Sequence, residues 1–86
     1  MCMTDYIKER AQEIEKTAHA KIEIIDKLIS HVVTSCHDVG YLPRAGALAV
    51  LLLGMHVSLM EEKAAALRVI EDAIALRRAT KDLVQS

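Results

Sequence analysis

The sequence predicts an all-α protein, a long antiparallel two-helix hairpin that is completed as a four-helix bundle by homodimerisation. Three observations predict this fold. Apolar residues recur at helical spacing through most of the 86 residues. The strongest break, which contains Gly40 and Pro43, lies near the middle of the chain. Phe and Trp are absent, so the core must be aliphatic, which suits helix packing better than strands.

The first helix is expected to cover residues 4–39, with Thr4 as N-cap and Asp5 in the first turn. No Gly or Pro interrupts this segment. Its apolar residues follow one another in steps of three or four, so they form a single stripe that we expect to face the second helix. The stripe consists of Ile7, Ala11, Ile14, Ala18, Ile22, Ile25, Ile29, Val32, Cys36 and Val39.

The turn is expected at residues 40–43. Gly40 fits a C′ position with left-handed backbone geometry, and Pro43 fits the first turn of the next helix. A short connection between helices favours antiparallel neighbours, and counting outward from the turn predicts that facing residue numbers sum to about 84.

The second helix is expected to cover residues 43–84, and its two halves differ. Residues 45–60 carry no formal charge, whereas residues 61–84 are amphipathic. We expect Gly46 and Gly54, within the uncharged run, to permit close helix approach. The residues of the second half that are expected to face inward are Ala66, Val69, Ile70, Ala73, Leu76 and Leu83.

The uncharged run must be covered, because a helix that is apolar on every face has no side suited to water. In an isolated hairpin each exposed Leu, Val or Met would be penalised by roughly 1.5–3 kcal/mol. The cover could be a second copy, a helix of another protein or a membrane. A run of this length spans only about 24 Å, and it contains His56 and Ser58, so a membrane is the least favoured cover. The predicted interface residues are Leu48, Leu51, Leu52, Met55 and Leu59.

The sequence carries no pattern typical of catalysis or of a cofactor or metal site. The four histidines, His19, His31, His37 and His56, lack the spacing of helical metal ligands. Glu15 and His19 are expected on the outer side of the first helix, and Cys36 is expected to be an inert residue of the apolar stripe. One alternative is a small all-α dimeric enzyme that uses buried cations such as Lys21 or Arg77. A second alternative is a histidine-containing metal-binding bundle.

The composition restricts the remaining classes of protein. Eleven basic and twelve acidic residues leave a net charge of −1, which does not favour nucleic acid or an anionic membrane. Two unpatterned cysteines and a polar N-terminal segment lead us to expect a cytoplasmic protein. We therefore expect a single domain, residues 1–86, that is a non-enzymatic interaction module such as a small adaptor, chaperone or regulator-binding protein. The sequence leaves open a dimer or a higher oligomer, and a permanent self-interface or a surface for a partner helix.

Overall fold

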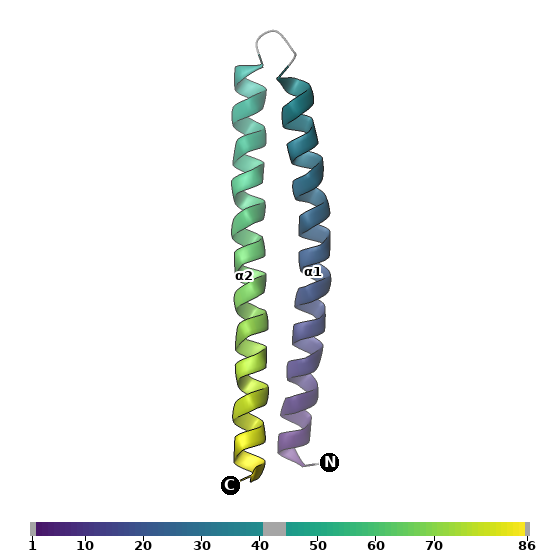
Figure 1. Cartoon of the computed structure of the whole chain (residues 1–86), viewed down its shortest axis with the longest axis vertical. Coiled ribbons are helices and arrows are strands. Elements are labelled where there is room, and N and C mark those ends of the chain that lie inside the picture. The colour runs from purple at the N-terminus through teal and green to yellow at the C-terminus, as the bar shows by residue number, and fades with distance from the viewer. Residues whose placement is uncertain (1, 41–44, 86) are drawn as a thin grey trace.

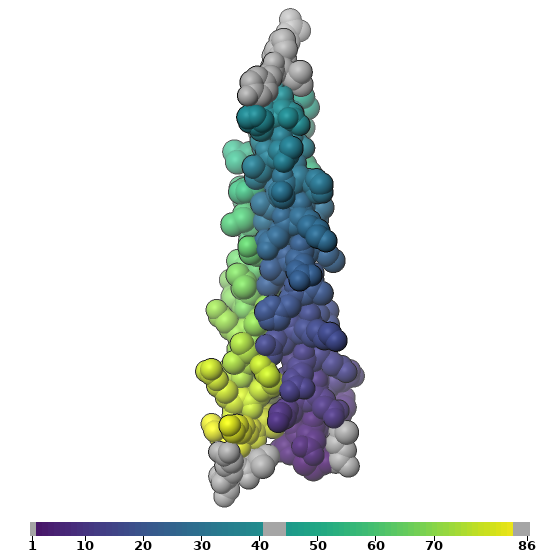
Figure 2. All heavy atoms as spheres, turned by 45° about the vertical axis from the view of Figure 1, so that its right-hand side comes forward, coloured from purple at the N-terminus to yellow at the C-terminus, as the bar shows by residue number. Residues whose placement is uncertain are grey.

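The two predicted helices are present and pack against each other as a hairpin. The computed structural model describes residues 2–40 and 45–85. Helix α1 (Met3–Val39) and helix α2 (Gly46–Gln85) run antiparallel side by side (Figure 1). They form a rod of 66 × 15 × 13 Å (Figure 2). The all-α hairpin is thus confirmed, while most of the predicted turn, including Pro43, lies outside the described residues.

The core is a narrow seam between the helices, built on a seven-residue repeat. On α1 the buried residues are spaced by seven, and on α2 they are spaced by three, four or seven. This repeat is typical of helices that pack along one stripe in the manner of a coiled coil. The buried residues are Ala11, Ala18, Ile25 and Val32 on α1, and Ala66, Ile70, Ala73 and Thr80 on α2. The Thr80 hydroxyl donates to the Leu76 carbonyl oxygen at 2.8 Å, so its polar group is satisfied within the helix.

The predicted ends of α1 are wrong in detail. The N-cap is Cys2, not Thr4, and no side chain makes a capping hydrogen bond there. Gly40 is the C-cap and has right-handed geometry, with φ −58° and ψ −18°, so it does not adopt the predicted left-handed conformation. Gly40 thus keeps helix-like dihedral angles at the end of α1, and its N–H donates to the Cys36 carbonyl oxygen at 3.1 Å.

Several residues predicted to face inward are exposed. Ile14 and Cys36 on α1 lie outside the packed seam, as do Val69, Leu76 and Leu83 on α2. The reason is that each helix has a single helical neighbour, which covers two adjacent rows of side chains and leaves the third row in solvent.

Within the hairpin, the glycines of α2 do not show the expected close helix approach. A Cβ atom built on Gly46 or Gly54 would meet no atom within 4 Å. Neither glycine therefore marks a close approach of α1 to α2.

Three ion pairs join the helices and report their register. Lys21 Nζ lies 3.3 Å from Glu62 Oε2, and Lys63 Nζ lies 2.8 Å from Asp26 Oδ1. Arg77 Nη2 lies 2.6 Å from Glu15 Oε2. The residue numbers of these pairs sum to between 83 and 92, which brackets the predicted register of about 84. The prediction that Glu15 lies on the outer side is wrong, because its side chain is only 20% exposed against Arg77.

Candidate interaction surface

The hairpin leaves the uncharged run of α2 without a cover. None of residues 45–60 is buried. Seven of the nine Leu, Val and Met side chains of the run are between 46% and 69% exposed: Leu48, Val50, Leu51, Leu53, Met55, Val57 and Met60. One packed stripe on one neighbouring helix therefore does not remove this segment from water.

The five predicted interface residues fall into two adjacent rows. Leu52 and Leu59 are half-buried, in the row that continues through buried Ala66 and Ala73 at seven-residue steps. Leu48, Leu51 and Met55 are exposed. The structure thus places part of the predicted set against α1 and leaves the rest on the surface beside it.

The exposed part belongs to a longer apolar surface that follows one flank of the hairpin. On α2 its residues are spaced by seven, and on α1 a matching row has the same spacing. We call these residues the open seam: Ile14, Lys21 and Leu28 on α1, and Leu48, Met55, Glu62, Val69 and Leu76 on α2. Residues seven apart lie on one side of a helix when the helices pack with a seven-residue repeat. The six apolar members are 42% to 53% exposed.

Two hollows show that the rows from α1 and α2 flank the same side of the hairpin. One hollow is lined by Ile14, Ala18 and Lys21 from α1 and by Ala65, Ala66 and Val69 from α2. The other is lined by Leu28 and Val32 from α1 and by Met55, Ser58 and Leu59 from α2. Both hollows have mainly apolar walls. The hairpin's own side chains therefore leave depressions along the open seam.

One ion pair interrupts the apolar character of the open seam. Lys21 lines the first hollow and pairs with Glu62, which lines neither hollow, and the two side chains are 57% and 59% exposed. Lys21 is the central residue of α1, which begins at Met3 and ends at Val39. The charged pair thus stands near mid-height, with apolar residues above and below it.

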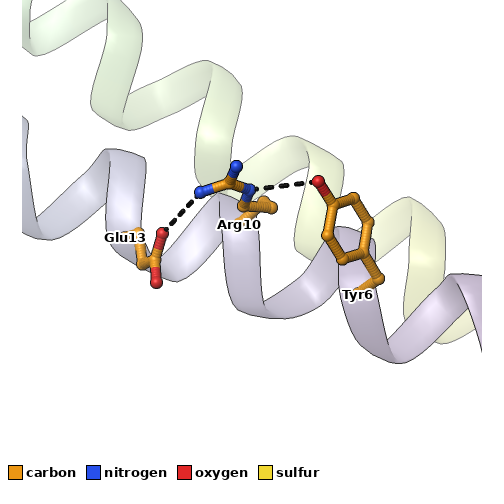
Figure 3. A network of polar contacts seen from close by, with 3 residues as sticks. All are labelled: Tyr6, Arg10 and Glu13. Atoms are coloured by element: carbon orange, nitrogen blue, oxygen red, sulfur yellow. Dashed lines mark hydrogen bonds and ion pairs between the residues drawn. The ribbon is translucent and has the colours of Figure 1, made fainter. Parts of the chain in front are cut away.

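A second polar cluster lies near the N-terminal end of α1. Arg10 Nε donates to the Tyr6 hydroxyl at 3.2 Å, and Arg10 Nη1 donates to Glu13 Oε2 at 3.1 Å (Figure 3). The Arg10 guanidinium also lies 5.6 Å from the centre of the Tyr6 ring. The hydrogen bonds to Tyr6 and Glu13 raise the pKa of Arg10, which is positively charged with or without them. This cluster is exposed and local to α1, and only Glu13 reaches the wall of a hollow.

The histidines and cysteines form no metal-binding cluster in residues 2–40 and 45–85. No group of three or more His, Cys, Asp or Glu side chains in this part of the chain could hold a metal ion. His56 is half-buried, whereas His19, His31 and His37 are exposed. Cys2 and Cys36 are exposed free thiols, so the predicted packed position of Cys36 is wrong.

Sequence reasoning missed most of the open seam. Val69 and Leu76 were expected to face α1, and Leu28, Lys21 and Glu62 were not assigned to any surface. The signal that could have found the α2 row was its spacing: residues 48, 55, 62, 69 and 76 repeat every seven positions beside the predicted interface.

Comparison with known proteins does not add a family to this description. No protein-family model, curated protein or solved structure matches the chain. Neither described helix contains a stretch that is both long enough and apolar enough to cross a membrane.

Proposed function

We propose that the protein is a non-enzymatic interaction module that associates with a second copy of itself through the open seam. The observation that carries this proposal is the apolar row from Leu48 to Leu76, which the hairpin leaves exposed along its length. An exposed apolar surface of this extent, with its ion pair at mid-height, is typical of a protein–protein interface.

The accessible surface area of the hairpin also supports association with another chain. The chain exposes 6,686 Å², whereas a globular monomer of its 9.5 kDa mass is expected to expose about 5,000 Å². The excess per chain is about twice the roughly 800 Å² that each partner contributes to a standard protein–protein interface. A second hairpin is the simplest structure that removes a large part of this excess.

The shape of the hairpin supports a second copy as the occupant. The 66 Å and 15 Å dimensions of the rod give a face of about 1,000 Å², compared with the roughly 800 Å² that each partner contributes to a standard interface. A second hairpin of equal length covers the open seam from end to end, and the product is a four-helix bundle. Most soluble oligomers are symmetric homodimers, which agrees with this choice.

The test is the mass of the protein in solution. We expect light scattering at micromolar concentration to give twice the 9.5 kDa of one chain. The Met55→Lys variant places an unpaired charge in the open seam of each copy, and we expect it to weaken the dimer by roughly a hundredfold or more, from several kcal/mol of desolvation.

The matched control is Val50→Lys. Val50 is 69% exposed and lies in the same apolar run, but its position is off the seven-residue row of the open seam. We expect this variant to remain dimeric, with helix content in both variants confirmed by circular dichroism. A wild-type monomer, or equal weakening by the two substitutions, would contradict the proposal.

A further inference from the structure

The Lys21–Glu62 pair is poorly explained by the stability of the hairpin alone. The two charged atoms are 3.3 Å apart, but both side chains are more than half exposed. Such a pair contributes only about 0–1 kcal/mol to folding, because solvent screens it. The position of this pair in the middle of the otherwise apolar open seam therefore needs another explanation.

We propose that the Lys21–Glu62 pair determines how two copies face each other. The inference rests on the proposed self-association. In this arrangement a two-fold axis runs along the bundle, so that α1 of each copy lies against α2 of the partner. Lys21 of each copy then meets the partner's Glu62, and four charges of alternating sign surround the axis at one level.

The charges disfavour the alternative symmetric dimer, in which the same two surfaces meet but the two hairpins point in opposite directions. If the two-fold axis were perpendicular to the bundle, α1 would lie against the partner's α1. Because Lys21 is the central residue of α1, the two lysines would then lie directly opposite each other, as would the two Glu62 carboxylates. Like charges directly opposite are unfavourable, and charged residues at such positions are known to set the partner and orientation of packed helices.

The apolar rows agree with the proposed arrangement. Lys21 and Glu62 mark one level, and seven residues away along each helix Ile14 shares a level with Val69. In the other direction Leu28 shares a level with Met55. With the axis along the bundle, Ile14 meets the partner's Val69 and Leu28 meets the partner's Met55. Each apolar level therefore meets an apolar level, which holds for the perpendicular axis as well. The charged level is the feature that distinguishes the two arrangements, because only the axis along the bundle brings it against its complement.

The first experiment uses charge reversal. In Lys21→Glu each copy carries two negative charges at this level, and in Glu62→Lys each copy carries two positive charges. We expect each variant alone to dissociate at least tenfold more readily than the wild type. Mixing the two variants is expected to restore a dimer that contains one copy of each, measured by native mass spectrometry.

Formation of the heterodimer shows whether Lys21 and Glu62 act between the two copies or only within one copy. Each variant has lost the attraction inside its own hairpin, so only charges on the partner can rescue association. The matched control is the pair Asp26–Lys63, which lines neither hollow of the open seam. We expect Asp26→Lys and Lys63→Glu to remain homodimers, with no preference for each other when mixed.

The second experiment measures the orientation of the copies. Cys36 is exposed and lies fifteen residues from Lys21 towards the turn, so it can carry a spin label in a Cys2→Ser background. With the axis along the bundle, both labels lie at the same end, and we expect a distance below about 30 Å from helix spacings of 8–10 Å plus the label arms. With the perpendicular axis the labels would lie about 45 Å apart along the rod.

The outcomes distinguish the two proposals. A wild-type monomer overturns the proposed function together with this inference. A wild-type dimer whose charge-reversed variants do not form a heterodimer overturns the inference alone, as does a label distance of about 45 Å.

Discussion

The two halves of the hairpin bury their side chains to different degrees, although they share the same pair of helices. The half far from the turn contains Ala11 and Ala18 opposite a segment with Ala66, Ala73 and Thr80, and all five are buried. The half near the turn contains buried Ile25 and Val32 on α1, but none of the leucine-rich residues 45–60 of α2 is buried.

The difference shows what a single neighbouring helix can cover. Small side chains sit close to the helix axis, so one neighbour is enough to exclude water from them. Large side chains on several faces extend beyond the contact, and only further helices can bury them. One neighbouring helix therefore buries α2 in the half far from the turn, whereas it leaves residues 45–60 of α2 in the half near the turn exposed.

The largest expected effect on stability tests the packed half. Ile70 is 7% exposed, and we expect Ile70→Ala to lower the free energy of unfolding by about 2–5 kcal/mol, because it removes buried methylene groups and leaves a cavity. The measurement is urea denaturation at one fixed protein concentration, since the stability of a dimer depends on concentration. The control is Leu53→Ala at a site that is 60% exposed, where we expect a change of less than about 0.5 kcal/mol. Equal losses at the two sites would show that the halves do not differ in packing.

A smaller loss of stability is expected from overpacking the half far from the turn. Ala73 is 4% exposed between the helices, and Ala73→Leu forces them apart. We expect a loss of about 1–3 kcal/mol by urea denaturation. Ala75→Leu places the same side chain on an exposed position of the same helix turn and should leave stability almost unchanged. A stabilised Ala73→Leu variant would show that this half is loosely packed.

The smallest expected effect concerns the half near the turn. A Cβ atom on Gly54 meets open space, so Gly54→Ala should gain about 1 kcal/mol from helix propensity, measured by thermal unfolding. Arg68→Glu, at an exposed site in the other half, serves as the control and should change little. A loss for Gly54→Ala would show that a neighbour packs against this glycine, which would have to come from another chain.

Much of the hairpin could be predicted from the sequence, because helical periodicity and the break near Gly40 are local signals. The ten-residue stripe predicted on α1 contains all four of its buried residues, but it also contains Ile14 and Cys36, which are exposed. The conformation of Gly40 could not be predicted, because Gly tolerates right-handed and left-handed geometry almost equally.

The side of α2 that faces α1 could not be predicted either. Adjacent rows offered two apolar choices: one contains Val69 and Leu76, and the other contains Ile70 with Lys63 and Arg77. Apolar periodicity predicts that residues of both rows face inward, but the structure buries Ile70 and leaves Val69 and Leu76 exposed. The cations of the Ile70 row pair with carboxylates on α1, at 2.8 Å for Lys63 and 2.6 Å for Arg77. These contacts join residues that are far apart in the sequence, so the apolar spacing within α2 does not reveal them.

The sequence by itself determined that the protein has two long helices, an aliphatic core and an uncharged segment, residues 45–60, that one neighbour does not cover. These follow from local propensity and from the periodicity of apolar residues, which act within a single helix. Only the tertiary structure decided which row of α2 meets α1, and therefore which row remains as the open seam with Lys21 and Glu62 at mid-height. That choice depends on contacts between residues far apart in the chain, and no property of one helix alone contains it.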